Sequence, residues 1–293
     1  EGLVGIDERA ELDFYRGQRW AEPSTEHLKE LLRWVHENPT RAAAIGERAR
    51  RDMVENWQWK HVAAIAAERL REISARLVSP RPVSSTTPAS VTKPAVLPQA
   101  GRFTAVAASA TEAKPNGDPG CGQVPLAVRW EGSQFVRHSL ALVNRELCIK
   151  LAQDPGIELS IIPYEGHEFG PEVDPRFRLI ADRMNRRLSR PADIHVRHQW
   201  PPNLTPPPEG RWVVLQPWEY GSIPSAWLEA WRDRIDDIWA YTRYVRDCYV
   251  RSGIPSDRVH VVPIGVDVEK FHPDARPLPL KTHKRFKFLF VGG

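Results

Sequence analysis

The first 78 residues carry apolar side chains at helical spacing. In the segment STEHLKELLRWVHEN, leucines and a valine recur every three or four residues after a Ser-Thr capping signal. Two similar segments follow, one from Thr40 and one from about Gln58 to Leu77. We expect three amphipathic helices, forming either a small bundle or the helical tail of a larger α/β domain. No strand that could supply a sheet is expected in this block.

From Val124 onward, short apolar runs alternate with segments of helical period. The predicted strands are VPLAVRW, IELSIIP, DIHVRH, RWVVLQP, DDIWAY, DRVHVVP and a closing run from Phe286 to Val291. The helices between them include one that begins at Ser133 and one over DPRFRLIADRMNRRL. This alternation predicts an α/β fold with a Rossmann-like, doubly wound parallel sheet. Ligands of such sheets bind at the carboxyl ends of the strands.

Residues 79–123 separate these two patterns. The stretch SPRPVSSTTPASVTKPAVLPQ is rich in Pro, Ser, Thr and Ala and poor in large apolar residues. Because it cannot bury enough surface to offset the entropy lost on ordering, it predicts a disordered, semi-extended linker. The linker divides the chain into a helical unit at 1–78, an α/β domain at 124–284 and a closing strand segment at 285–293.

Composition and charge narrow the function classes. The 293 residues are 41% hydrophobic and carry a net charge of +4, with basic and acidic side chains interspersed. The sequence contains no nucleic-acid-binding motif. A mild affinity for anionic substrates or membrane surfaces is compatible with the net positive charge. The 3 cysteines lack CxxC spacing, so they predict neither a zinc site nor a disulfide framework and favour a reducing compartment.

The sequence contains few signals that indicate where in the cell the protein is located. No apolar run approaches the roughly 18 residues of a membrane span, and no signal peptide is recognisable. We expect a cytoplasmic protein, with the inner face of the membrane as an alternative location. The chain begins at Glu1 rather than at Met, and we interpret it as an internal fragment of a longer protein.

The turn after the first predicted strand is one candidate binding site. Gly132 allows a tight turn, and Ser133 is expected at a helix N-terminus, where free N–H groups favour a phosphate or a sugar hydroxyl. An ordinary strand-to-helix turn with a Ser cap is the alternative. The single glycine does not match the GxGxxG motif, so NAD or FAD binding is disfavoured.

A second candidate site combines an acid with aromatic side chains. Glu219 stands between Trp218 and Tyr220 in the loop QPWEYGSIP, and His198 lies in VRHQWPPN, after the preceding strand. An acid flanked by aromatics at the carboxyl end of a strand is typical of a site that positions a sugar. The alternative is that the aromatics pack the loop while Glu219 caps the following helix.

We expect no divalent-metal site. His195 and His198 are three apart on a predicted strand and therefore point to opposite faces, and the adjacent Asp236 and Asp237 also point apart. The sequence contains no GxSxG motif and no P-loop.

The string DDIWAYTRYVRDCYVRSGIPSDRVHVVPIGVDVEKFHP resembles the end of the N-terminal domain of retaining, GT-B fold glycosyltransferases of the group-1 family. VPIGVDVEKFHP is its most specific part, and FKFLFVGG is similar to the first strand of the family's second domain. QPWEYGSIPSAW resembles a loop of a bacterial subgroup, so the resemblance covers about 124–293. The helices of 1–78 are similar to those that end a group-1 C-terminal domain, which implies a tandem protein of two modules.

The resemblance implies transfer of a sugar, such as a hexosyl group, from a nucleotide-sugar donor to an acceptor hydroxyl with retention of configuration. It implies no metal or other cofactor. The implied partners are the nucleotide sugar, a glycan or other hydroxyl acceptor, and a donor-binding domain that continues beyond residue 293. Surface-polysaccharide or glycan assembly is the family's commonest setting.

The resemblance also implies roles for individual residues. It assigns Gly132 and Ser133 to the loop near the acceptor and the donor diphosphate, and Gly292 and Gly293 to a turn near the donor phosphates. It places Glu219 where many relatives have a catalytic His or acid. The fragment alone is expected to be inactive. A non-catalytic glycan-binding or scaffold module with the same fold is the alternative function.

Overall fold

The computed structural model describes residues 3–6, 17–76, 124–276 and 279–288. Its N-terminal part contains three helices, as the periodicity predicts: α1 (Thr25–Glu37), α2 (Pro39–Asn56) and α3 (Trp59–Ala75). Two short strands, β1 (Leu3–Gly5) and β2 (Arg19–Ala21), pair antiparallel. The expectation that no strand of this block supplies a sheet is therefore wrong, since β1 and β2 form a two-stranded sheet.

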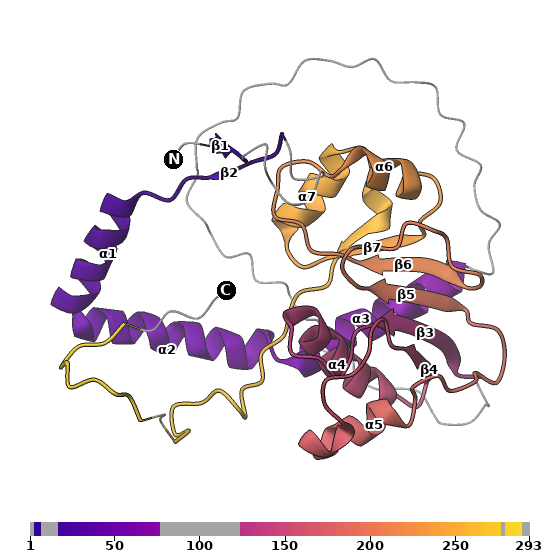
Figure 1. Cartoon of the computed structure of the whole chain (residues 1–293), viewed down its shortest axis with the longest axis horizontal. Coiled ribbons are helices and arrows are strands. Elements are labelled where there is room, and N and C mark those ends of the chain that lie inside the picture. The colour runs from indigo at the N-terminus through magenta and orange to yellow at the C-terminus, as the bar shows by residue number, and fades with distance from the viewer. Residues whose placement is uncertain (1–2, 7–16, 77–123, 277–278, 289–293) are drawn as a thin grey trace.

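The part of the chain that follows is built around one parallel sheet (Figure 1). Its strands are β3 (Leu126–Gly132), β4 (Ile157–Ile162), β5 (Ile194–His198), β6 (Arg211–Leu215), β7 (Asp237–Ala240) and β8 (Val259–Val261). All six are parallel, in the order β4-β3-β5-β6-β7-β8. Each matches a predicted apolar run, so the α/β class with a parallel sheet flanked by helices is confirmed. The arrangement is consistent with a Rossmann-like fold.

The helices between the strands differ from the predictions in two places. They are α4 (Ser139–Ala152), α5 (Arg178–Ala181), α6 (Ser225–Trp231) and α7 (Arg243–Arg251), with single 3₁₀ turns at η3 (Pro171–Val173), η4 (Pro175–Phe177) and η5 (Ser256–Arg258). The first difference is the start of α4, and the second is the length of α5.

Helix α4 begins at Ser139, with His138 as N-cap, and not at the predicted Ser133. The carbonyls of the preceding loop have other partners. The guanidinium of Arg145 donates to the carbonyls of residues 134 and 136, and the Phe135 carbonyl accepts from the Glu168 N–H at 2.8 Å. These bonds to residues outside the loop hold residues 133–138 in a non-helical conformation.

The helix predicted over DPRFRLIADRMNRRL is reduced to η4 and the four-residue α5. After α5 the backbone returns to the edge of the sheet. The N–H of Ile161 donates to the Arg183 carbonyl at 2.9 Å, and the N–H of Asn185 donates to the Ile161 carbonyl at 2.7 Å. Asn185 has a positive φ of 52°, which ends any helix at this point. Long-range pairing with β4 therefore overrides the local helical pattern.

The two faces of the sheet carry separate hydrophobic cores. Side chains of α3 and α4 pack with β3, β4, β5 and β6 on one face, whereas α6 and α7 pack with β6 and β7 on the other. Helix α3 buries eight residues, among them Leu70 and Ile73, and its Arg69 pairs with the fully buried Asp237 of β7. α3 therefore packs against the sheet. The assignment of 1–78 and 124–284 to two different modules stays a prediction.

Helices α1 and α2 make a contrast with α3. Neither buries a single residue, and Figure 1 shows both extending away from the sheet.

The predicted linker at 79–123 lies outside the described residues. Of the predicted closing strand, residues 286–288 have no strand conformation, while 289–291, Gly292 and Gly293 lie outside the described residues.

Candidate functional site

The order of the strands defines one point where the connections reverse direction across the sheet. β3 pairs with β4 on one side and with β5 on the other, and Gly132 at the end of β3 is in register with His198 at the end of β5. Crevices at the carboxyl ends of strands beside such a switch point are the common binding sites of open α/β sheets. The structure thus brings two predicted site residues, Gly132 and His198, side by side at this position.

The packing around Gly132 explains why this residue is a glycine. A Cβ atom here would lie 2.6 Å from Nδ2 of Asn144 and 2.6 Å from the carbonyl oxygen of His198. Neither neighbour is the free end of a flexible chain, since both belong to a buried network. The glycine permits close approach of β3, β5 and α4, and this need accounts for it without a bound phosphate.

Below the surface, four side chains form a hydrogen-bonded group that we call the floor: Trp130, Asn144, His198 and Tyr241. Nδ2 of Asn144 donates to the carbonyls of Ser133 (2.9 Å) and His198 (3.1 Å), so its Oδ1 is the acceptor. That oxygen accepts from Trp130 Nε1 and from His198 Nδ1, each at 2.8 Å. His198 therefore carries its proton on Nδ1, and its Nε2 accepts from the Tyr241 hydroxyl at 2.6 Å.

This environment keeps His198 neutral. The ring is 0% exposed, and burial, together with the nearby His138, lowers the pKa of His198 from its ordinary value of 6.5 to about 3. Burial also raises the pKa of Tyr241 above its ordinary value, with the charge of Glu219 as a further cause. The predicted contact of His198 with a ligand is untested. The geometry buries the His198 side chain beneath the surface, among Asn144 and Tyr241.

Three exposed ionisable side chains near floor residues are called the rim: His138 and Glu165, which pair with each other, and Glu219, whose charge acts on Tyr241. His138 Nδ1 accepts the N–H of Ala141 at 3.3 Å, so its Nε2 carries the proton that is donated to Glu165 Oε1 at 2.8 Å. The buried Ser133 hydroxyl donates to the same oxygen. These bonds lower the pKa of Glu165 below its ordinary value and keep it ionised at neutral pH.

The predicted aromatic pair beside Glu219 is buried. Trp218 is 1% exposed and donates from Nε1 to the Ser222 carbonyl at 2.7 Å, and Tyr220 packs against it with ring centroids 5.0 Å apart. This matches the alternative in which the aromatics pack the loop. Glu219 itself is exposed. Helix α6 has Pro224 at its N-cap and no side-chain capping bond, so Glu219 does not cap it.

Sequence reasoning missed five members of the site: Trp130, His138, Glu165, Asn144 and Tyr241. The signal for Tyr241 was available, since it is the last residue of the predicted strand DDIWAY and parallel strands gather their carboxyl ends at one edge. The predicted helix ran through His138, which concealed its capping role. Glu165 lies in an irregular loop after β4, where no pattern distinguishes it from other surface acids.

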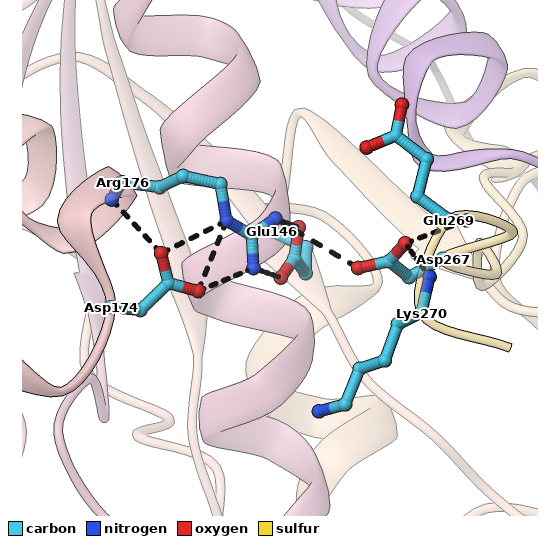
Figure 2. A network of polar contacts seen from close by, with 6 residues as sticks. All are labelled: Glu146, Asp174, Arg176, Asp267, Glu269 and Lys270. Carbon is cyan, nitrogen blue, oxygen red and sulfur yellow. Dashed lines mark hydrogen bonds and ion pairs between the residues drawn. The ribbon is translucent and has the colours of Figure 1, made fainter. Parts of the chain in front are cut away.

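The string that carries the family resemblance has its own structural role (Figure 2). Asp267 follows β8 and accepts the N–H groups of Glu269 at 3.1 Å and Lys270 at 3.0 Å, which fixes a turn. Its carboxylate lies 4.0 Å from Arg176, which also pairs with Asp174 at 2.7 Å and binds the buried Glu146 of α4 at 3.2 Å. The network ties the segment after β8 to the domain beside α4.

The described residues contain no group of three His, Cys, Asp or Glu side chains that could hold a metal ion. Within the same segments, no helix has both the length and the apolar character needed to cross a membrane. His195 and His198 do point to opposite faces, since His195 contacts Glu131 at 2.9 Å while His198 faces α4.

No protein-family model matches this sequence, and no curated protein matches it either.

Proposed function

We propose that the chain is part of a nucleotide-sugar-dependent, retaining glycosyltransferase of the GT-B type, in which residues 124–284 form the acceptor-side domain. One observation carries the proposal. Two exposed carboxylates lie after strands of the parallel sheet, at the carboxyl ends where open α/β sheets bind ligands: Glu165 follows β4, and Glu219 follows β6. The resemblance of VPIGVDVEKFHP to the group-1 family supports the same function.

The rim residues suit an acceptor that carries hydroxyl groups. The hydrogen bonds from Ser133 and His138 both go to Oε1 of the ionised Glu165 carboxylate. The other oxygen, Oε2, can therefore accept a hydrogen bond from a sugar hydroxyl. Glu219 is the candidate for proton transfer from the attacking hydroxyl, because a general base must reach the substrate and Glu219 is exposed. The donor phosphates would be held by a second domain that begins near Gly292 and Gly293.

A non-catalytic glycan-binding or scaffold module stays the alternative. Two observations favour it: Gly132 is explained by packing alone, and His198 is locked in a neutral floor. Both functions place hydroxyl-bearing ligands at the rim and differ in whether a sugar is transferred. An assay must therefore measure binding and transfer separately.

The test is Glu219→Gln in the full-length protein, with Glu229→Gln on α6, an equally exposed acid, as the matched control. Loss of a general base lowers turnover by about 10²-fold or more, so transfer should fall in Glu219→Gln only, while glycan binding and unfolding free energy stay close to wild type. Equal turnover in all three proteins would remove Glu219 from the mechanism. Glycan binding without transfer, in wild type as well, would favour the scaffold.

A further inference from the structure

A polar pocket lies at the outer edge of the sheet, far in strand order from the switch point. It has a volume of about 480 Å³ and lies between α7 and β8, the end strand of the sheet. Its lining includes Arg243 and Arg246 of α7, Ser256 of η5 and His260 of β8. None of these residues belongs to the floor or to the rim.

His260 is held in one orientation by a buried carboxylate. Its Nδ1 lies 3.0 Å from Oδ1 of Asp237, a side chain that is 0% exposed. The other oxygen of Asp237, Oδ2, accepts a hydrogen bond from Nε of Arg69 at 2.9 Å. Because a carboxylate at neutral pH only accepts hydrogen bonds, Nδ1 of His260 carries a proton. His260 is in register with Trp239 and binds the carboxylate that Arg69 of α3 also binds, so its ring lies on the α3 face of the sheet and not among the side chains that face α7.

The charge of the pocket favours an anion. Arg243 and Arg246 each bring a permanent positive charge, and the acid among the lining residues is Asp247. Asp247 pairs with Arg246 at 2.9 Å, but it is 51% exposed, and such surface pairs are weak. The pair therefore leaves the guanidinium of Arg243 and part of that of Arg246 to a ligand.

We propose that this pocket binds a phosphoryl group, with Arg243 and Arg246 as its cationic ligands and Ser256 as an additional hydrogen-bonding partner. Guanidinium groups match the oxygens of phosphate in a bidentate geometry, and several converging donors suit a group with three free oxygens better than a carboxylate with two. The inference does not depend on sugar transfer, because the pocket and the switch point lie at different strands. The phosphoryl group can come from a soluble metabolite or from a lipid headgroup.

The experiment measures binding of inorganic pyrophosphate by calorimetry at low salt, and of vesicles containing phosphatidic acid by co-sedimentation. The variant is Arg243→Gln with Arg246→Gln, and the control is Arg48→Gln with Arg51→Gln, a pair on α2 at the same three-residue spacing. We expect the α7 variant to lose affinity by about tenfold or more, and the control to keep it.

The outcomes separate the sources and test the site. Pyrophosphate binding that the α7 variant loses supports a soluble phosphoryl ligand, and vesicle binding alone with the same loss supports a lipid headgroup. Equal binding by wild type and the α7 variant would overturn the proposal. So would absence of binding to both probes, or binding of citrate as tight as that of pyrophosphate. Circular dichroism of each variant checks that the fold is intact.

Discussion

The floor and the rim of the candidate site are joined through Ser133, and they differ in burial and in hydrogen bonding. In the floor, Asn144 and His198 are 0% exposed and their polar atoms have partners within the group. In the rim, His138 and Glu165 are 43% and 41% exposed and make bonds that solvent can replace. The floor is thus built for stability, and the rim is available for chemistry.

This difference teaches how to sort the residues that sequence reasoning selected. Gly132, His198, Trp218 and Tyr220 are buried structural members, whereas Glu219 is exposed. A polar residue at the carboxyl end of a strand is therefore not a ligand-binding residue by position alone. Substitutions in the floor should lower the free energy of unfolding, and substitutions in the rim should lower binding or turnover with little effect on stability.

The largest effect is expected for Asn144→Ala. Removing the carboxamide leaves Trp130 Nε1, His198 Nδ1 and two backbone carbonyls without their partner, and each unsatisfied buried group costs about 1–3 kcal/mol. We expect a loss of roughly 4 kcal/mol in urea unfolding. Asn56→Ala at the exposed end of α2 is the control, with a change within about 0.5 kcal/mol. Similar values for the two variants would contradict the floor as a stabilising unit.

The next effect is expected for Gly132→Ala. The added methyl group meets Asn144 and the His198 carbonyl at 2.6 Å, and overpacking of this kind costs about 1–3 kcal/mol. Gly166→Ala in the loop after β4 is the control, because a Cβ there has no neighbour within 4 Å. A Gly132→Ala protein as stable as wild type would show that the loop relaxes freely, and a bound ligand would then be the better explanation of the glycine.

A third prediction separates the floor from the rim by pH. The pKa of His198 is lowered to about 3 in the fold and returns to about 6.5 on unfolding, so the unfolded state binds more protons between these values. This contribution to stability is fully present above pH 6.5 and is lost as pH falls towards 3, with a slope of at most about 1.4 kcal/mol per pH unit. The ordinary pKa of a glutamate is 4.5, and that of Glu165 is lowered. Glu165 therefore contributes stability above pH 4.5, and this contribution is lost only at more acidic pH.

The imidazole ¹⁵N shifts of His198 give the direct measurement. We expect the neutral Nδ1–H tautomer at pH 5, with Nε2 unprotonated. Protonation of His198 at that pH would contradict the floor geometry, in which Nε2 accepts from Tyr241. Urea unfolding at several pH values between 5 and 7 then shows whether the expected slope is present.

The strands and the sheet class were predictable from the sequence because a strand buried on both sides must be a short apolar run. The start of α4 was not, because it depends on Arg145 and on Glu168, which reach residues 133–138 only in the folded chain. The same holds for the role of α3. Its apolar stripe resembles that of α1, and no local pattern says that α3 packs on the sheet while α1 buries nothing.

The site was predictable in outline and not in detail. The rule that ligands bind at strand ends selects Gly132, His198 and Glu219, but exposure decides which of them can touch a ligand, and exposure depends on Asn144 and Tyr241 from other elements. Glu165 gains its place only because Ser133 and His138 converge on one of its oxygens.

The smallest expected effect belongs to Tyr241→Phe, which keeps the ring and removes one hydroxyl. Nε2 of His198 then loses its donor at 2.6 Å, and an unsatisfied buried acceptor costs about 1–2 kcal/mol. Tyr244→Phe, two positions into α7 and 55% exposed, is the matched control with no expected change. Because the hydroxyl is part of the floor, glycan binding at the rim should stay intact in both variants. A Tyr241→Phe protein of unchanged stability but reduced binding would instead move Tyr241 from the floor to the rim.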